Sequence, residues 1–473
     1  MKYFVILLLF LSSCQGLLDK EPQNKISLEE TFTDFESAKV ALSGAYRSFL
    51  EISYYNGNRM LYPEVTGGNV KYSQISKTIL LDTYFFAASA DDGDMNNTYQ
   101  QLYSILNNLN NIIYYVPSIT NGTEKTRTRL VAEATALRAL VHLDLVQLFA
   151  QHYGYTANAS HEGIILNLEP VLLSESIRAR STVAECYQAI LADLQQALVL
   201  FENSTAVFSD GSTKNYMSPA AVKGLMARVY LNMGNWQEAY QYADELIASN
   251  SYSLYTNAGY VTAWIQTNTS ESIFELAVPT SFTGTSLGTY FDVSTVSASS
   301  TDLQMAATTD LLSLYSATDV RNQSHFYTSA TVSNTEYWFC QKYPTGSANA
   351  TPIKVIRLSE MYLIRAEAAA ELGNLTQALA DLNTIQQRAD STAVALSISD
   401  SQQLIDRILL ERRKELCYEG FLLFDLARRQ ENVTRTDCSG STCTLQYPSP
   451  YYVLPFPTLT VQVNPLLSQN PGY

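Results

Sequence analysis

A helix-turn-helix pattern that occurs twice in the chain constrains its fold more than any other feature. In residues 358–388, apolar side chains recur at helical spacing on both sides of Gly373-Asn374, a pair suited to end one helix and begin the next. The small residues Ala366 and Ala378 allow the two helices to approach closely. An isolated hairpin of this kind leaves an apolar face in water, so we expect it to pack against similar hairpins.

Residues 218–249 repeat this pattern earlier in the chain. When the two segments are aligned on Gly234-Asn235, Trp236 stands where Leu375 stands, and we therefore interpret Trp236 as a packing residue. Two copies of one hairpin predict a degenerate helical-repeat architecture, and their pattern resembles tetratricopeptide repeats. We expect a mainly α fold.

The amino terminus resembles the export signal of a bacterial lipoprotein. Residues 1–13 combine a positive charge at Lys2 with a short apolar run, which is typical of a signal peptide. The run ends in Leu-Ser-Ser-Cys, which resembles a lipobox, so we expect Cys14 to become the lipidated first residue; an ordinary signal peptide that contains a cysteine is the alternative. Residues 14–25 then form a lipid-anchored tether, and no other stretch is apolar and long enough to span a membrane.

The composition excludes several classes of function. The net charge is −15 and the 30 Lys and Arg residues form no long run, so we expect no nucleic-acid partner, because phosphate binding needs clustered cations. The four His residues show no ligand spacing relative to the Cys residues, so we predict no zinc site, and we assign no residue to a metal or cofactor. Cys438 and Cys443 bracket a short polar loop, and in an exported protein we interpret them as a candidate disulfide.

Two segments lose the helical period. Residues 54–93 and about 252–350 are rich in Tyr, Asn and Ser, and the second contains a predicted strand at 272–278 and a short predicted helix near 309–315. A long irregular segment is either functional or disordered, and the aromatic content argues against disorder. We therefore expect the ligand to bind in these two segments.

Several motifs, in order along the chain, resemble the SusD/RagB family of nutrient-binding lipoproteins. They are a segment after the lipobox, two early helices, the start of the second hairpin, a charged helix with a Glu-Gly pair, and the carboxyl terminus: Leu18–Pro22, Ala41–Tyr46, Ala132–Ala139, Arg357–Ala368, Glu411–Gly420 and Asn464–Tyr473. One such motif alone carries little weight, but their order over nearly the whole chain makes the resemblance specific.

The resemblance implies a SusD-like α/α superhelix of four tetratricopeptide-like hairpins with an irregular, loop-rich insert that contains short strands. It implies a single domain at 26–473, with an amino-terminal part at about 26–250 and a carboxyl-terminal part at about 251–473. Proteins of this family capture oligosaccharides or peptides at the outer membrane and deliver them to a SusC-like, TonB-dependent barrel transporter. We therefore expect a non-catalytic, surface-exposed binding protein that is anchored to the outer membrane by lipid.

Glycan capture needs aromatic faces that stack on sugar rings and polar groups that bind hydroxyls. The candidates lie in the non-helical segments. The two tryptophans rank first, because a large ring in a polar loop is less often needed for core packing. These residues are Trp264, Trp338, Tyr290, Tyr72, Tyr84 and Phe86. For each of them, core packing is the alternative interpretation.

Asp91, Asp92 and Asp94 form an acidic group with three interpretations. Their alternate spacing resembles the start of a calcium loop, but the glycine and the closing glutamate of such a loop are missing. The simplest interpretation is a helix amino terminus, where Asp caps the backbone and favours the helix dipole. The third is an acidic rim that attracts basic peptides.

The ligand class stays open at the level of sequence. The aromatic segment favours an oligosaccharide, while the acidic group and a compact length for the family favour a peptide. A tetratricopeptide-like scaffold that binds only protein partners is an alternative of a different class. A helical glycosidase is another, but it needs two carboxylates facing a cleft, and the sequence shows no such pair at a recognisable spacing.

Overall fold

The computed structural model describes residues 32–73, 79–171, 177–208, 213–279, 281–282, 284–292, 305–344, 351–438 and 443–473. The expected signal peptide, Cys14 and the tether lie outside these residues. Among the helices of the described chain, none is long and apolar enough to cross a membrane.

Most of the described chain is helical, as predicted. The long helices are α2 (Phe35–Ser48), α3 (Asn58–Gly67), α5 (Gly93–Tyr115), α6 (Glu124–Phe149), α7 (Val183–Glu202), α8 (Pro219–Met233), α9 (Trp236–Ala248), α14 (Leu358–Glu371), α15 (Leu375–Ala389) and α16 (Ser401–Leu416). The short helices are α4 (Leu81–Tyr84), α10 (Tyr260–Ala263), α11 (Gly288–Phe291), α12 (Thr309–Ser313), α13 (Gln323–Phe326), α17 (Leu422–Arg428) and α18 (Thr458–Val463).

The two predicted hairpins are α8–α9 and α14–α15, and their turns are built alike. Gly234 and Gly373 adopt left-handed backbone (φ 69° and 80°), which glycine tolerates without a steric penalty. The asparagine that follows each glycine caps the next helix through its side chain, which accepts a backbone N–H. Helix α9 packs against α14, so each hairpin covers the apolar face of the other. Trp236 packs against the main core, as predicted.

The strands form four small antiparallel pairs. These are β1 (Val70–Tyr72) with β3 (Met305–Ala307), β2 (Ser272–Leu276) with β6 (Ile353–Arg357), β4 (Tyr327–Val332) with β5 (Thr335–Cys340), and β7 (Val433–Thr434) with β8 (Thr444–Leu445). The predicted strand at 272–278 and the predicted helix near 309–315 are present as β2 and α12. The segment at 252–350 has more regular structure than its sequence indicates, because β4 and β5 form a hairpin within it.

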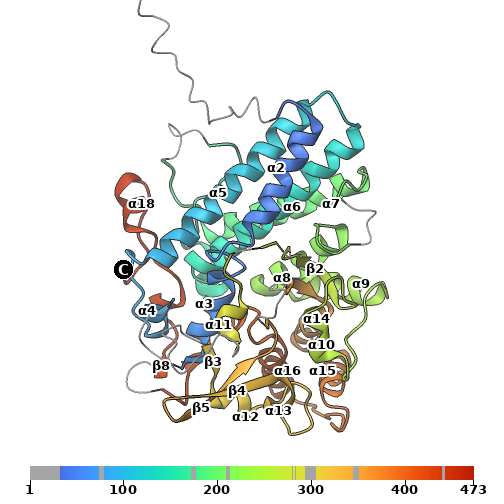
Figure 1. The fold of residues 1–473 in the computed structure, drawn as a ribbon, viewed down its shortest axis with the longest axis vertical. Helices are drawn as coiled ribbons and strands as arrows, with labels where there is room; N and C mark the ends of the chain where they lie inside the picture. Colours follow the sequence, from blue (N-terminus) through green and yellow to red (C-terminus); the bar gives the residue numbers. More distant parts are fainter. Residues whose placement is uncertain are drawn as a thin grey trace, which may run out of the picture.

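The helices and the strands occupy different parts of the molecule. Helices α2, α5, α6 and α7 pack side by side in the upper half of Figure 1, whereas β3, β4, β5, α12 and α13 gather at its lower end. The carboxyl-terminal segment runs along one side, where β8 and α18 lie. Strand β3 contacts β5, so the β1–β3 pair and the β4–β5 hairpin are neighbours.

A buried network of ion pairs joins α16 to β6 and to the insert. Arg357, at the end of β6, donates hydrogen bonds to Glu271, Glu415 and Glu419 over 2.7 to 3.0 Å. Arg321 pairs with the other carboxylate oxygen of Glu415 at 2.8 Å. Side chains buried at this depth need partners, because an unpaired charge in the interior is costly. The network therefore fixes the insert against the helical scaffold.

Candidate functional site

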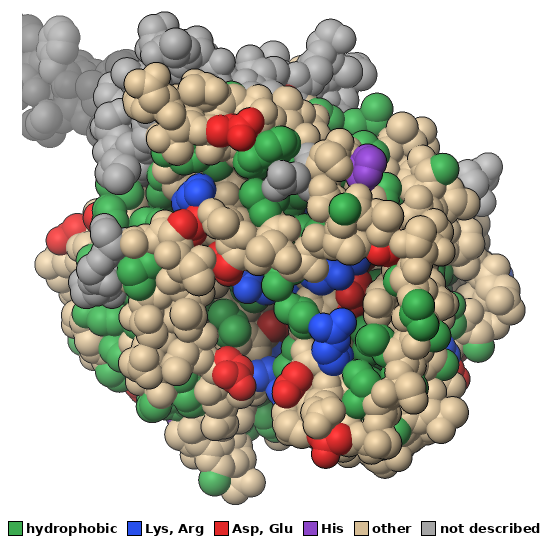
Figure 2. Space-filling model, turned by 90° about the horizontal axis from the view of Figure 1, so that it is seen from below, with side chains coloured by type: hydrophobic (Ala, Val, Ile, Leu, Met, Phe, Trp, Pro, Cys, Tyr) green, Lys and Arg blue, Asp and Glu red, His purple; other side chains and the backbone are tan. Residues whose placement is uncertain are grey.

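A pocket of about 350 Å³ opens beside the β4–β5 hairpin, at the end of the molecule where the strands gather. Its walls come from β1, β3, α12 and β5, and its lining residues are Lys71, Ala307, Thr309, Leu312, Ser313, Glu336, Tyr337 and Trp338. We call this the strand-end pocket. Figure 2 looks onto this end of the molecule, where side chains of both charges gather near the middle of a hollowed face.

Local sequence explains how β5 presents its aromatic residues. Ser333 and Asn334 adopt left-handed backbone (φ 49° and 64°), which is the geometry of a tight two-residue hairpin turn. The turn fixes a register in which Tyr337 pairs with Ala330 and Trp338 with Ser329. Both aromatic rings face small residues across the strand and are half-buried, so part of each ring remains open to solvent.

Lys71, which lines the strand-end pocket, is held by Asp437, which lies behind the lining residues. The Lys71 ammonium donates to Asp437 Oδ2 at 2.7 Å and lies 5.6 Å from the centre of the Tyr337 ring. The same carboxylate oxygen accepts from the Thr309 backbone N–H at 2.8 Å and from its hydroxyl at 3.0 Å. Burial raises the pKa of Asp437, but the hydrogen bonds from Lys71 and Thr309 outweigh burial and lower it overall. Asp437 is therefore a carboxylate at neutral pH.

The pocket offers the chemistry that a hydroxyl-rich ligand needs. Tyr337 and Trp338 are aromatic lining residues, while Lys71, Thr309 and Glu336 supply donors and acceptors among the same lining. In the part of the chain that the structure describes, no group of three or more His, Cys, Asp or Glu side chains could hold a metal ion.

Of the predicted aromatic residues, Trp338 lines the strand-end pocket and Trp264 does not. The expectation that Trp264 is exposed is wrong, because its side chain is fully buried. Its ring packs among Tyr260, Phe326 and Tyr343, and the Lys342 ammonium lies 4.5 Å from its centre. Trp264 is a core residue, and two of these neighbours, Phe326 and Tyr343, come from distant parts of the sequence.

Tyr72 and Tyr84 form an aromatic cluster that packs against Arg435. Their rings are 5.1 Å apart, and the Arg435 guanidinium lies 4.3 Å from the centres of both the Tyr84 and the Phe86 rings. Tyr72 and Tyr84 are buried, contrary to the expectation that they are exposed, while Phe86 and Tyr290 are half-buried. Because Tyr72 follows Lys71 on β1, the cluster lies on the opposite face of this strand from the strand-end pocket.

The acidic group begins helix α5. Asp92 is its N-cap, and Asp92 Oδ1 accepts the backbone N–H groups of Asp94 and Met95 at 2.8 and 3.1 Å, so the capping interpretation is confirmed for this residue. Asp91 is exposed. Burial and the neighbouring Asp92 raise the pKa of Asp94. Burial, with a contribution from Asp94, raises the pKa of Tyr290 to about 12. Neither residue lines the strand-end pocket.

Sequence reasoning missed most of this pocket. Tyr337 and Glu336 could have been found as neighbours of Trp338 on a strand. Lys71, Thr309 and Asp437 carried no signal, because Lys71 and Asp437 are 366 positions apart and neither lies in a motif.

A larger pocket of about 460 Å³ lies between α5 and α18. It is lined mainly by apolar surface, and its residues are Tyr99, Tyr103, Asn107, Ile165, Asn167, Val171, Ile177, Arg178, Thr460, Val463 and Asn464. We favour the strand-end pocket as the ligand site in spite of its smaller volume. It alone of the two combines half-exposed aromatic rings with an ammonium and a carboxylate.

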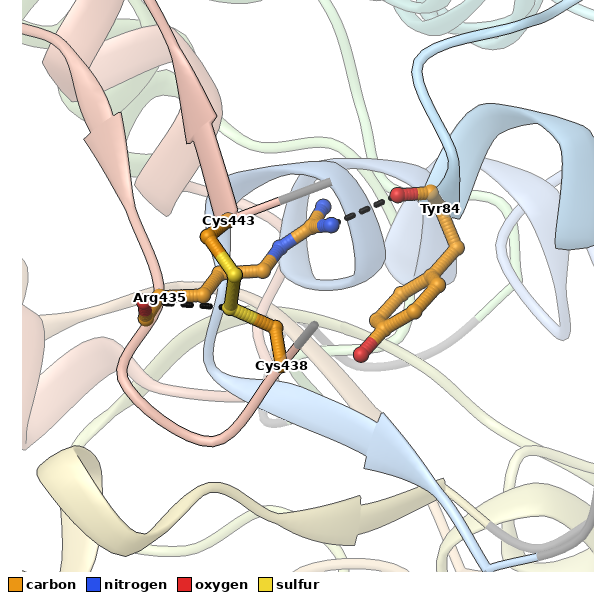
Figure 3. Close-up of a disulfide and its surroundings, with 4 residues drawn as sticks. All are labelled: Tyr84, Arg435, Cys438 and Cys443. Atoms are coloured by element: carbon orange, nitrogen blue, oxygen red, sulfur yellow. Dashed lines mark hydrogen bonds between the residues drawn. A yellow bond between two sulfur atoms is a disulfide. The ribbon is translucent and has the colours of Figure 1, made fainter. Parts of the chain in front are cut away.

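The candidate disulfide is present. Cys438 and Cys443 are bonded to each other beside the β7–β8 pair, and Figure 3 shows the bridge next to Arg435 and Tyr84. Of the other cysteines in the described chain, Cys186, Cys340 and Cys417 are free and buried.

Two family models match the chain, one in each part. Residues 17–231 match the family described as "Starch-binding associating with outer membrane", and residues 288–473 match the SusD family. The chain is 24% identical to SusD-like protein P38 of Formosa agariphila, with 89% of each protein covered. It is 23% identical to a SusD-like protein of Bacteroides ovatus, covering 89% of this chain and 80% of that one.

Solved structures share the fold over nearly the whole chain. A SusD superfamily protein from Bacteroides thetaiotaomicron superposes with a TM-score of 0.83 at 26% identity, covering 93% of this chain and 100% of that one. A protein from Bacteroides vulgatus to which sugar binding is attributed superposes with a TM-score of 0.81 at 28% identity. The match covers 94% of this chain and 99% of that one. Surface glycan-binding protein A from Bacteroides uniformis has the same fold, with a TM-score of 0.74 at 19% identity, covering 92% and 99%.

Proposed function

Because the chain belongs to the SusD/RagB family, we propose that it is a cell-surface protein that captures oligosaccharides and delivers them to a SusC-like, TonB-dependent outer-membrane transporter. The family assignment and the mainly α superhelical fold with a strand-containing insert, both expected from the sequence, are confirmed. Like the sugar-binding and glycan-binding proteins that it resembles, the chain is a binding protein and not an enzyme.

The observation that carries the choice of ligand is the wall of the strand-end pocket. Tyr337 and Trp338 both line the pocket together with Lys71 and Glu336, and the Tyr337 ring centre lies 5.6 Å from the Lys71 ammonium. As neighbours on β5, the two aromatic side chains start from opposite faces of the strand. Aromatic stacking contributes about 1 kcal/mol per ring, so stacking on these residues and several hydrogen bonds support weak to moderate binding of a short oligosaccharide.

The family description supports the location. The model that matches residues 17–231 is described as associating with the outer membrane. We propose that Cys14 carries the lipid, that residues 14–25 are the tether, and that residues 26–473 form one domain on the outer surface. Delivery to a SusC-like barrel is the part of the proposal that rests on the family resemblance alone.

A calorimetric titration tests the proposed ligand class. The soluble chain without residues 1–14 is titrated with α-glucan, β-glucan, xylan, mannan and fructan oligosaccharides, and then with a peptide digest. We expect saturable heat with at least one oligosaccharide class. Trp338→Ala and Tyr337→Ala should each weaken that binding about fivefold, because each removes one stacking contact of about 1 kcal/mol.

The matched control is Tyr114→Ala, which removes an exposed aromatic ring on α5 and should leave the affinity unchanged. Heat with the peptide digest alone would reject oligosaccharides and support the peptide alternative. If the affinity does not change in the Trp338 and Tyr337 variants, the ligand does not bind in the strand-end pocket.

A further inference from the structure

A short hairpin near the carboxyl terminus is closed by the only disulfide of the described residues. We call residues 433–438 and 443–445 the disulfide hairpin. Its ladder consists of Val433 with Leu445 and Thr434 with Thr444, extended by a hydrogen bond of 2.8 Å from Arg435 N to Cys443 O. Two strands of two residues each are too short to be stable alone. The hairpin therefore depends on its cross-link and on its contacts with the rest of the chain.

Its first contact reaches the strand-end pocket. Asp437 directly precedes Cys438, and one of its carboxylate oxygens accepts from Lys71 on β1 and from Thr309 at the start of α12. The two residues that it binds belong to the pocket wall and come from different segments. Asp437 therefore adds a side-chain link between β1 and the start of α12, next to the β1–β3 ladder that already joins these segments.

Its second contact reaches the segment that leads into the pocket. Arg435 is buried, and its guanidinium donates to the carbonyl oxygens of Val65, Thr66 and Tyr84 over 2.6 to 3.0 Å. Figure 3 shows the guanidinium pointing from beside the bridge toward Tyr84. Burial lowers the pKa of Arg435 to about 10, so it remains charged at neutral pH. The arginine thus ties the end of α3 to α4.

Gly68 shows how closely Arg435 approaches the backbone that follows α3. This residue has left-handed backbone (φ 97°), and a Cβ added to it would lie 3.1 Å from Arg435 Cγ. A glycine is therefore needed where Arg435 passes the turn between α3 and β1. Phe86, whose ring centre lies 4.3 Å from the guanidinium, also adopts left-handed backbone (φ 56°), which is unusual for a bulky residue.

We propose that the disulfide hairpin holds the strand-end pocket in its binding shape, with Asp437 and Arg435 as positioning residues and the Cys438–Cys443 bridge as the constraint that aligns them. The inference rests on the proposed function, because it assigns the bridge a role at the same site. Opening the bridge leaves the helical scaffold intact but loosens β1, the start of α12 and the segment around Tyr84. The affinity for oligosaccharide then falls although no ligand contact has been removed.

The test compares the wild type with Cys438→Ser/Cys443→Ser and with Asp437→Asn. Affinity is measured by calorimetry with the oligosaccharide that the wild type binds, and backbone hydrogen exchange is followed at residues 65–72, 84–86 and 305–309. We expect at least fivefold weaker binding and at least fivefold faster exchange in these segments for both variants. Exchange in α8, α9, α14 and α15 should not change. The control is Glu431→Gln, an exposed residue just before the hairpin.

Dithiothreitol gives an independent comparison in the wild type. Two thiols of the reagent supply two electrons and two protons, which convert the bridge into two cysteine thiols while the reagent becomes a cyclic disulfide. Reduction should reproduce the exchange pattern of the double serine variant. Unchanged exchange at residues 65–72 and 305–309 after opening the bridge would overturn the inference, whether or not a ligand is known.

Faster exchange with unaltered affinity would overturn the link between the bridge and the ligand. A wild type that binds no oligosaccharide would reject the proposed function instead, and the exchange data would still decide whether the bridge holds these segments.

Discussion

His142 is a residue whose burial has a measurable consequence. It lies in the middle of α6, and its Nε2 accepts the backbone N–H of Asn167 at 3.3 Å. Burial lowers the pKa of His142 to about 3, and the nearby positive charge of Arg138 contributes to the shift. The imidazole is therefore neutral in the folded protein, whereas in the unfolded chain it takes up a proton near pH 6.5.

The sign of the pH dependence follows from this difference. Between pH 6.5 and about 3 the unfolded chain binds one more proton at His142 than the folded chain, so acid favours unfolding. We expect the stabilising contribution to be complete above pH 6.5 and to fall by roughly 1.4 kcal/mol per pH unit below it. In His142→Gln, urea unfolding from pH 7 to pH 5 should show a smaller loss of stability than in the wild type. His325→Gln, at an exposed position, is the control. Parallel pH profiles of His142→Gln and the wild type would contradict the assignment.

Single residues also show where the sequence could not separate site from core. Trp264 and Trp338 both lie in polar, non-helical segments, and local sequence gives them the same expected exposure. Trp264 is enclosed by aromatic residues from separate segments, whereas Trp338 lies on a hairpin with one face toward a pocket. Exposure of a large ring depends on tertiary neighbours, which composition does not contain.

At the scale of elements, the turn of the α14–α15 hairpin can be tested directly. Gly373 has left-handed backbone, and a Cβ added there would meet no atom within 4 Å. Gly373→Ala should therefore lower the free energy of unfolding by about 1 kcal/mol through backbone conformation alone. Gly373→Asn should cost less, because asparagine tolerates this conformation. Urea denaturation of both variants measures the difference, and equal losses would show that packing dominates at this turn.

We expect the loss of a carboxylate from the buried ion network to lower the free energy of unfolding much more than the loss of one from a surface ion pair. Glu415 accepts hydrogen bonds from Arg321, Arg357 and Arg388, and these charges overcome burial to hold its pKa well below the ordinary value of 4.5. Glu415→Gln leaves three guanidinium groups short of a buried partner and should destabilise the protein by about 3–5 kcal/mol at pH 7. Glu51→Gln, which opens an exposed pair with Arg47, should cost less than about 1 kcal/mol.

The pH dependence of the Glu415 effect has a defined sign. Because the folded pKa is lowered, the contribution of the carboxylate is complete above pH 4.5 and is lost as the pH falls through the folded value. The stability difference between the wild type and Glu415→Gln should be constant from pH 7 to pH 5 and shrink in stronger acid. A difference that grows in acid would show that the charge of Glu415 does not stabilise the fold.

Elements were predictable where their signals are local. The two hairpins follow from helical periodicity and from the Gly-Asn pairs, and the structure has both of them with the predicted turns. The strand-end pocket is not local, because its walls come from β1, β3, α12 and β5. The pairing of β1 with β3 could not be predicted, because both strands are short, they lie in polar segments, and β3 follows β1 by more than two hundred residues.

At the scale of the whole molecule, the proposed lipid anchor at Cys14 can be tested by fractionation and labelling. We expect the wild type to fractionate with the outer membrane and to take up labelled palmitate. Cys14→Ala should lose the label and the membrane association, because buried acyl chains supply about 0.8 kcal/mol per methylene group. Cys186→Ser, at a buried position in α7, should keep the label. A Cys14→Ala protein that still carries labelled lipid would place the anchor elsewhere.

The contact between Lys71 and Asp437 has a consequence for the order of assembly. The ribosome synthesises the chain from its amino end. Asp437 lies 366 positions after Lys71, so the ion pair cannot form until most of the chain has been made. The helical hairpins, whose contacts are short in sequence, can form while this partner is still missing. The strand-end pocket is then completed only after these hairpins. In a chain without its final forty residues, the helical hairpins could still form. The strand-end pocket would lack Asp437, the partner of Lys71.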